Sequence, residues 1–464
     1  MKESTKAIFH WDRDFSRRVL RVALPIALQN LVAASAHIVD GLMVAGLGDA
    51  HYAAVTQAGR YSFLFQLFLF GAASGSSIFI SQFWGKRDVA GIRKVMSLCW
   101  RITVGLALIF MLGALLIPRP IMSLFLQEGQ SRELAIEYLS WVGLNYLFCS
   151  VDIVFSNTLR AADRPTVAMT AGIAGILTNT LANYTLIYGH FGFPALGVRG
   201  AAIATVLASA VSLCINAGYT YRRRQPGAIR MQEMRMPGKA FVLGYIKRVL
   251  PVVANEGLWS LGVTLYSVFY GMLGDAAVNA MGVHGNVDQL MTVLLFGVVN
   301  AAAILIGNSI GAGDREGAIL ISRRMLFAVE ALAAVTGAAL LLLRYPILGF
   351  FSRLSEETLQ KAALILLIAA LEMPFRFFNT INIVGVLRAG GDTVFSMILD
   401  AGSVWGIGVP SVAFATLVLG LPIEGVFLFS FLEELVKIGV GLPRFLSGKW
   451  INNLTAIGKE EAKA

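Results

Sequence analysis

The sequence contains a long internal repeat: residues 24–91 return as residues 250–317 at a constant offset of 226 and without a gap. Seventeen of the 68 aligned positions are identical. They cluster at prolines, glycines and turns, such as Leu-Gly-Asp-Ala at 47–50 and again at 273–276. Each copy opens a half-chain of hydrophobic segments. A repeat of this kind in an apolar chain is typical of membrane transporters whose site lies between two similar halves.

Composition indicates that the chain resides in a lipid bilayer. Of its 464 residues, 56% are hydrophobic and only 14% are charged, whereas a soluble domain carries about 25% charged residues. The mean hydropathy is +0.70, and many apolar runs approach the length of about 20 residues that a helix needs to cross a bilayer. These runs do not alternate apolar and polar residues as the strands of a membrane barrel do. We therefore expect an all-α integral membrane protein.

Hydropathy predicts twelve transmembrane helices, six in each half of the chain. The predicted spans are 19–46, 51–83, 96–117, 134–158, 166–189, 200–221, 244–272, 277–310, 322–343, 359–387, 394–419 and 422–446. We expect an N-terminal bundle over 1–221, a cytoplasmic linker over 222–243 and a C-terminal bundle over 244–464. Because six is an even number, both halves cross the membrane in the same direction. The sequence therefore predicts two six-helix bundles related by a pseudo-two-fold axis along the membrane normal.

The loop charges predict the orientation of these spans. With both termini in the cytoplasm, the inner loops and the linker hold most of the lysines and arginines, including eight between positions 222 and 248. The outer loops hold only Arg119, Arg132, Arg199, Arg344, Arg353 and Lys361. This asymmetry is the positive-inside pattern of a multi-pass protein of the cell membrane. The formal charge of +10 then indicates contact with lipid headgroups rather than with nucleic acid.

Four ordered motifs give the chain a resemblance to a known family. They are His37–Gly41, which contains Asp40, then Thr178–Tyr184, Leu196–Thr205 and Gly385–Thr393. In this order and at these spacings the chain resembles the multidrug and toxic compound extrusion (MATE) transporters, over residues 17–450. The resemblance implies an antiporter with two six-helix bundles. Such a protein exports amphipathic, often cationic, organic compounds against H⁺ or Na⁺ entry, acts as a monomer and uses no cofactor or metal centre.

Asp40 is the first candidate for coupling to a cation. It lies in the outer half of the first span, about 15 residues beyond Pro25, and a buried acid in a membrane is costly unless it faces a cavity or a partner. Burial can make its protonation reversible near neutral pH. Pro25 removes one backbone hydrogen bond and permits a helix bend that the charge of Asp40 can bias. The alternative is a structural cap near the outer end of the helix.

Three further residues complete the expected cation site. Asn179 and Asn183 are spaced i, i+4 and share one face of the fifth span, and Thr205 lies early in the sixth. The resemblance implies that they form the N-terminal cation site with Asp40. Some relatives place an acid where Asn183 stands, so this site carries one negative charge fewer, which favours H⁺ over Na⁺. The alternative is interhelical hydrogen bonding, a common role of Asn and Thr in membranes.

Other polar residues in the spans are secondary candidates for coupling. They are Glu256, Asp288, His284, Asp152 and Asp400. His284 and Asp288 are spaced i, i+4 and are a possible proton relay, or they form a buried ion pair. The roles of Arg60 and Arg376 stay open, since Arg376 is i, i+4 from Glu372. Glu433 and Glu434 precede Lys437 by one helical turn, which indicates a structural ion pair.

Three other classes of function fit the sequence less well than export. A flippase for lipid-linked precursors or a polysaccharide exporter needs a strongly basic central cavity, and only Arg60 and Arg376 offer such charge. A membrane transferase needs a polar catalytic cluster, but the five histidines are scattered and form no metal-binding motif. A receptor or scaffold does not require intramembrane acids. The sequence therefore favours a transporter of small molecules over an enzyme.

Overall fold

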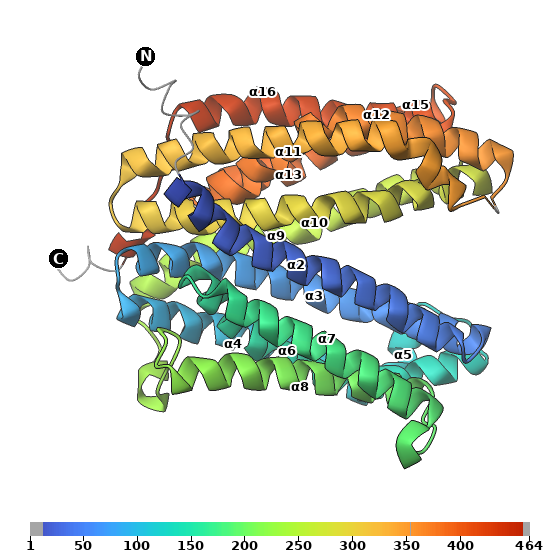
Figure 1. Cartoon of the computed structure of the whole chain (residues 1–464), viewed down its shortest axis with the longest axis horizontal. Coiled ribbons are helices and arrows are strands. Elements are labelled where there is room, and N and C mark those ends of the chain that lie inside the picture. Colours follow the sequence, from blue (N-terminus) through green and yellow to red (C-terminus); the bar gives the residue numbers. More distant parts are fainter. Residues whose placement is uncertain (1–12, 353, 458–464) are drawn as a thin grey trace. The chain divides into compact units, whose positions relative to one another are not determined.

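The computed structural model describes residues 13–352 and 354–457, and helices account for nearly all of them, with no strand in those two ranges. Figure 1 shows long helices joined by short turns. The helices of the first half are α2 (Arg13–Ala45), α3 (Asp49–Gly85), α4 (Val89–Leu116), the short α5 (Pro118–Ser123), α6 (Gln130–Ala161), α7 (Pro165–Tyr188) and α8 (Val198–Arg222).

The second half repeats this order with more interruptions. Its elements are α9 (Lys239–Gly271), α10 (Asp275–Gly311), α11 (Arg315–Gly349), α12 (Glu356–Thr380), η3 (Ile381–Arg388), α13 (Thr393–Ser403), η4 (Val404–Gly408), α14 (Val409–Leu417), α15 (Ile423–Ser430) and α16 (Leu432–Leu446). The segments η3 and η4 are π-helical. A π-helix is rare and is frequently found at a functional site.

Each predicted span coincides with a helix or with a run of joined helices. Nine segments among the described residues are long and apolar enough to cross a membrane by length and composition. These nine include Glu356–Arg388 and Thr393–Leu417, which continue through η3 and η4. The predicted all-helical membrane fold is confirmed, whereas the count of twelve spans stays a prediction.

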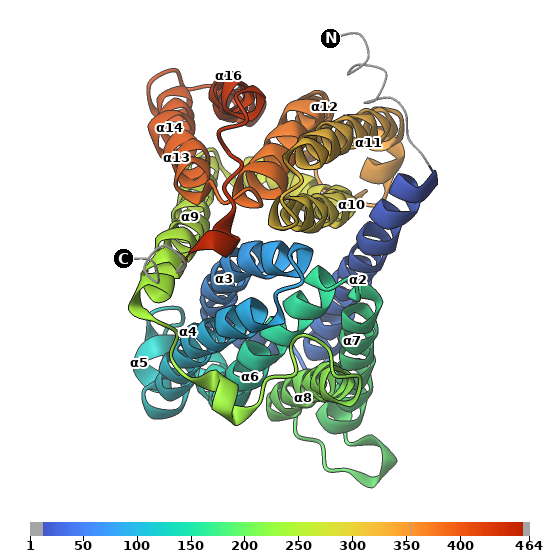
Figure 2. The ribbon, with the colours of Figure 1, turned by 90° about the vertical axis from the view of Figure 1, so that its left-hand side faces the viewer.

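The chain divides into two compact units. One contains residues 28–249, and the other contains residues 250–456 together with the start of α2 up to Ala27. The boundary therefore falls inside α2, just after Pro25, and inside α9, just before Pro251. Within the unit of residues 28–249, α7 and α8 lie side by side (Figure 2). The expected lobe boundaries at 221 and 244 stay a prediction.

The turns explain why the repeat is visible in the sequence. Gly48 and Gly274 precede α3 and α10 with φ of 106° and 93°, a backbone region that favours glycine. Asp88 and Asp314 cap α4 and α11, and each accepts a hydrogen bond of 2.8 Å from the backbone N–H three residues later. An aspartate at this position satisfies one of the free donors of the helix. The shared residues are therefore those that turn the chain and start its helices.

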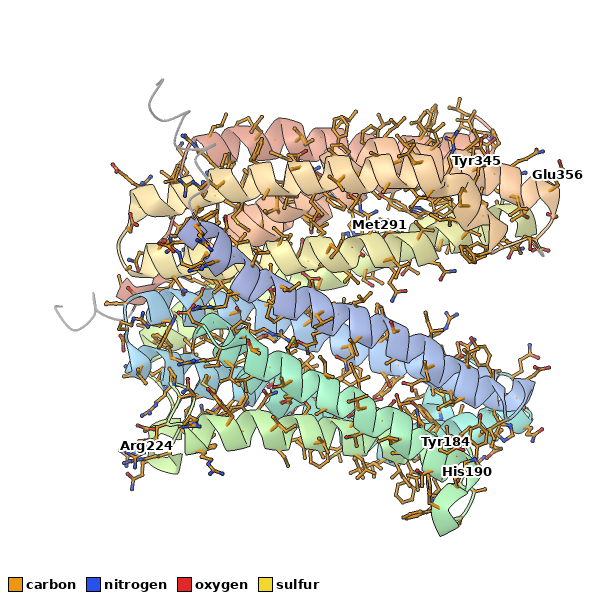
Figure 3. The ribbon with its side chains drawn as sticks, viewed as in Figure 1. Tyr184, His190, Arg224, Met291, Tyr345 and Glu356 are labelled. Carbon is orange, nitrogen blue, oxygen red and sulfur yellow. The ribbon has the colours of Figure 1, made fainter. Side chains whose placement is uncertain are left out.

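The two ends of the unit of residues 28–249 differ in their side chains. Arg224 lies at one end, whereas Tyr184 and His190 lie at the other (Figure 3). The rings of Tyr184 and His190 stack with centroids 4.2 Å apart. Aromatic residues at one boundary and basic residues at the other are typical of a helical membrane protein.

The linker between the halves is attached to α4. Its helical turn η2 (Met231–Met234) holds Glu233, which forms an ion pair with Arg93. The Glu233 carboxylate also accepts a hydrogen bond of 2.9 Å from the backbone N–H of Arg230. That hydrogen bond and the nearby Arg93 lower the pKa of the Glu233 carboxyl. The linker is therefore anchored by polar contacts, and the buried Ile229 adds an apolar one.

Gly200→Ala is expected to destabilise the protein by about 1–3 kcal/mol, the usual cost of overpacking. A Cβ atom at Gly200 of α8 would lie 2.6 Å from the backbone carbonyl of Leu186 in α7. Membrane helices use small residues for such close approach. The matched control is Gly218→Ala in the same helix, where a Cβ atom meets nothing within 4 Å. Thermal unfolding in detergent would contradict the prediction if both variants melted alike.

Candidate functional site

A cavity of about 840 Å³ lies within the unit of residues 28–249. Its walls come from α2, α3, α6, α7 and α8. Its polar lining residues are Asp40, Tyr52, Thr56, Ser62, Gln66, Tyr138, Asn145, Asp152, Asn179, Asn183, Thr205, Ser209 and Ser212. The remaining lining is formed by small and aliphatic residues with Phe63. Apolar walls with a few placed polar groups are the usual construction of a small-molecule site.

The structure brings Asp40, Asn179, Asn183 and Thr205 together at this cavity. The Nδ2 atom of Asn183 donates to Oδ1 of Asp40 at 2.9 Å. Asn183 is only 2% exposed, and this contact orients its amide. The i, i+4 spacing predicted that Asn179 and Asn183 share one face of α7, and the family resemblance implied that Asp40 and Thr205 join them.

The Asn179 amide also lies against Asp40. Its nitrogen faces the two carboxylate oxygens of Asp40 at 2.8 Å and 2.9 Å, and its oxygen accepts from the Thr205 backbone N–H at 3.3 Å. This orientation gives both amide atoms a partner, because an amide nitrogen donates and a carboxylate only accepts.

Asp152 lines the same cavity as Asp40. Its carboxylate accepts from Oγ of Ser212 and from Nδ2 of Asn216, both at 2.8 Å. The two donors are spaced i, i+4 on α8, and Asn216 is fully buried. These partners of Asp152 were not predictable from the sequence. The i, i+4 spacing of Ser212 and Asn216 indicates a polar face on α8, but nothing in the sequence showed that this face packs against α6.

Asp288 pairs with an arginine rather than with the histidine on its own helix. Both Arg376 guanidinium nitrogens donate to the carboxylate, at 2.6 Å and 2.7 Å. His284 instead contacts the ring of Phe427, with centroids 5.0 Å apart. The expected proton relay between His284 and Asp288 therefore has no hydrogen bond among the described contacts. Arg60 is exposed and does not line the cavity.

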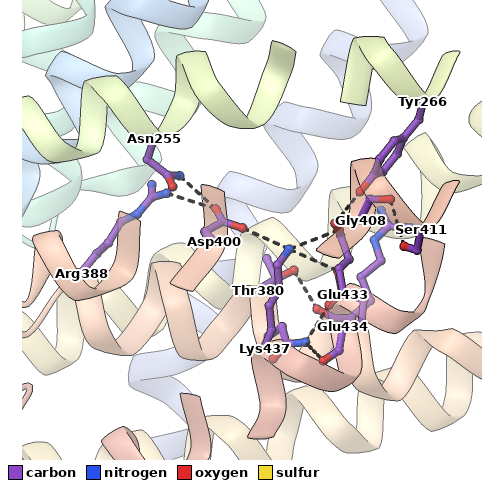
Figure 4. A network of polar contacts seen from close by, with 12 residues as sticks. Asn255, Tyr266, Thr380, Arg388, Asp400, Gly408, Ser411, Glu433, Glu434 and Lys437 are labelled. Carbon is purple, nitrogen blue, oxygen red and sulfur yellow. Dashed lines mark hydrogen bonds and ion pairs between the residues drawn. The ribbon is translucent and has the colours of Figure 1, made fainter. Parts of the chain in front are cut away.

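Glu256 and Asp400 belong to a polar network in the other unit. Arg388 of η3 donates to Glu256 at 2.7 Å and lies 3.8 Å from Asp400. Asp400 also accepts from Asn255 at 2.9 Å and pairs with Lys437 at 3.2 Å (Figure 4). These partners of Asp400 were not predictable from the sequence, because neither cation stands at a helical i, i+3 or i, i+4 spacing from it.

Comparison with known proteins agrees with the fold. The MatE family model matches residues 25–185 and again residues 251–414. A probable multidrug resistance protein NorM of Thermotoga maritima is 27% identical, over 94% of this chain and 93% of its own length. The multidrug resistance protein PmpM of Pseudomonas aeruginosa is 25% identical, over 85% of this chain and 82% of its own length. A multidrug resistance MATE transporter solved in an outward-facing conformation superimposes with a TM-score of 0.83 at 20% identity, covering 95% of this chain and 96% of that one.

The family match and the long apolar helices define a multi-pass helical membrane transporter of small molecules rather than an enzyme. The two matches of the family model start at positions 25 and 251, which are separated by the offset of the internal repeat. The chain belongs to the MATE family of multidrug efflux transporters.

Proposed function

We propose that this protein is a cation-coupled antiporter that exports amphipathic, often cationic, organic compounds by alternating access. The observation that carries the proposal is the Asp40 carboxyl group at a drug-sized cavity, held by the Asn183 amide at 2.9 Å. An acid inside a membrane bundle is by default a functional group. Coupling requires at least one group that can bind a cation from either side of the membrane.

The contacts of Asp40 favour H⁺ over Na⁺ as the coupling ion. A bound Na⁺ would need several oxygen atoms directed at it. Here the Asn183 nitrogen faces Oδ1 of Asp40, and a nitrogen donor repels a cation. The Asn179 nitrogen also faces this carboxylate, at 2.8 Å and 2.9 Å from its two oxygens. Two amide nitrogens directed at one carboxyl group supply no oxygen ligand for Na⁺, whereas a proton needs only the carboxylate itself.

The cavity also supports the proposed substrate class. Its volume of about 840 Å³ lies in the range of about 300–1,000 Å³ that holds drug-sized ligands. Asp40 and Asp152 both line it, whereas no lysine or arginine among the described residues does. Negative charge with apolar walls suits a compound that is both cationic and hydrophobic. A lipid-linked pyrophosphate would instead require arginines in the wall.

The remaining features of the proposal follow from the sequence. We place the protein in the cell membrane as a monomer, with both termini in the cytoplasm, because the basic residues gather in the loops predicted to lie inside. The bundles over 1–221 and 244–464 act as the two lobes. Pro25 lies inside α2 two residues before the boundary between the units, where a missing hydrogen bond permits a bend.

Purified protein in liposomes tests the coupling ion. An acidic lumen should drive accumulation of ethidium, a permanently charged dye that a pH gradient does not trap by itself. Nigericin, which collapses the pH gradient, should abolish that accumulation, and liposomes without protein supply the baseline. Accumulation driven by a Na⁺ gradient at equal pH would overturn the assignment of H⁺. If neither gradient moved any dye of a cationic panel, the exporter proposal itself would fail.

A further inference from the structure

Asp152 of α6 is an acid at the cavity wall whose hydrogen-bond partners are neutral. Its carboxylate accepts from Ser212 and Asn216, both at 2.8 Å, and no lysine or arginine of the described ranges forms an ion pair with it. Three other intramembrane acids do have a cation beside them: Arg376 pairs with Asp288, Arg388 with Glu256, and Lys437 with Asp400. A charge without a counter-charge is costly inside a membrane. A ligand cation in the cavity would remove that cost.

The hydrogen bonds to Asp152 are held in place by the packing of α8. Asn216 is fully buried, and its amide nitrogen also donates to Oγ of Ser156 at 3.0 Å. Ser212 lies against Gly175 of α7, where a Cβ atom would come within 2.9 Å of a backbone carbonyl of α8. A carboxylate can accept about four hydrogen bonds. Asp152 therefore keeps acceptor capacity for a ligand in the cavity that it lines.

The surroundings of Asp152 support an ionised carboxylate. Burial opposes the charge, whereas the two donors on α8 stabilise it, because hydrogen bonds to the charged form favour that form. Arg160, two helical turns further along α6, adds a positive charge that acts on Asp152. The guanidinium of Arg160 donates to neutral amide oxygens, those of Gln29 at 3.0 Å and Asn157 at 3.3 Å. The thiol of Cys149, one turn before Asp152, is the other titratable group that acts on it.

Asp152 and Asp40 lie at different depths of the cavity. Thr205 belongs to the Asp40 site, and it precedes Ser212 on α8 by seven residues. At a rise of 1.5 Å per residue the two positions are about 10 Å apart along the helix. One carboxyl group can therefore bind the coupling ion while the other contacts a different part of the same cavity.

The internal repeat indicates that Asp152 is not part of the shared scaffold. The end of α6, Leu-Arg-Ala at 159–161, returns at 387–389. At this offset of 228, Thr380 stands where Asp152 stands. The residues that both halves share turn the chain and start its helices. An acid that only one half carries is not needed for the fold that the halves have in common.

We propose that Asp152 is a specificity-determining residue, whose carboxylate binds the positively charged group of the exported compound, whereas Asp40 binds the coupling ion. The favoured substrate is an organic cation with a hydrophobic body. Its charge supplies the counter-charge of Asp152, and its body contacts the apolar lining, which includes Phe63, Val142 and Ile176. This assignment rests on the proposed export of cationic compounds through this cavity and adds the residue that selects them.

Binding of a matched pair of fluorescent probes to the purified full-length protein tests the assignment. The cation is the N-methylated form of dimethylaminostyryl-pyridine, and its partner is the same dye without the N-methyl group, which is uncharged at mildly alkaline pH. Asp152→Asn should weaken binding of the cation about tenfold or more, the usual effect of losing a contact with a charged group. The affinity for the uncharged dye should stay as in the wild type. Asp152→Glu keeps the charge and should keep the preference for the cation.

Asp152→Thr keeps the test decisive if Asp152→Asn does not fold. It places at this position the residue that the other half carries, Thr380, and it also removes the charge. The matched control is Glu137→Gln on the same helix, where the acid is exposed and lies outside the cavity lining. This control should bind both dyes like the wild type.

Two outcomes would overturn the assignment. If the neutral variants of Asp152 bound the cationic dye as tightly as the wild type, Asp152 would not select the substrate. If Asp40→Asn removed the preference for the cation and Asp152→Asn kept it, the substrate charge would lie at Asp40 instead. In both cases the exporter proposal would stand, because dye accumulation in liposomes decides it independently of these binding measurements.

Discussion

Asp40→Asn is expected to reduce export of ethidium to the level of cells that lack the transporter. The amide has the size of the carboxyl group and can still accept a hydrogen bond from Asn183, whose nitrogen lies 2.9 Å from Oδ1. It cannot bind a proton at physiological pH, so the step that draws energy from the proton gradient is lost. The measurement is dye accumulation in cells without their own exporters, with the amount of protein in the membrane determined in parallel.

The control for this loss is Asp49→Asn. Asp49 starts α3 nine positions beyond Asp40, is exposed, and does not line the cavity. The same chemical change there should leave export at the wild-type level. Full export by Asp40→Asn at normal expression would remove Asp40 from the coupling mechanism and would leave its contacts with Asn179 and Asn183 a structural role.

The sequence predicted the helices well because the signals are local. A span needs a run of apolar residues, and a turn needs a glycine such as Gly48 or a capping acid such as Asp88. The same holds for Asn179 and Asn183, which one helix brings to one face. Asp40 could be predicted as a residue of the cation site because an acid in a span must find a cavity or a partner.

The polar network of the second half was not predictable in this way. Arg388 reaches Glu256 across 132 positions, Asn255 reaches Asp400 across 145, and Tyr266 reaches Glu433 across 167. Which of these side chains meet depends on how the helices pack and on the π-helical turns. The limit of prediction from local spacing is visible on α16, which carries Glu433, Glu434 and Lys437. Their spacing on α16 predicted an ion pair, but the third acid and the tyrosine come from other helices.

Arg388→Met is expected to cause the largest loss of stability of any single substitution considered for this chain. Arg388 is 3% exposed, donates to Glu256 at 2.7 Å and lies 3.8 Å from Asp400. Methionine fills much of the space but leaves the Glu256 carboxylate buried without its cation. Removing one partner of a buried ion pair costs about 3–5 kcal/mol. Thermal unfolding in detergent should show a large drop in melting temperature.

Two companion variants identify the cause of that drop. Arg388→Met combined with Glu256→Gln removes both charges and should recover most of the lost stability, because a buried pair replaced as a whole is often nearly neutral. Arg444→Met breaks a more exposed contact, the 2.7 Å pair with Asp392, and should cost no more than about 1 kcal/mol. If the double variant were no more stable than Arg388→Met alone, the uncompensated charge of Glu256 would not be the reason. A structural role of Glu256 would then be unsupported, and Glu256 would again be a candidate for cation coupling.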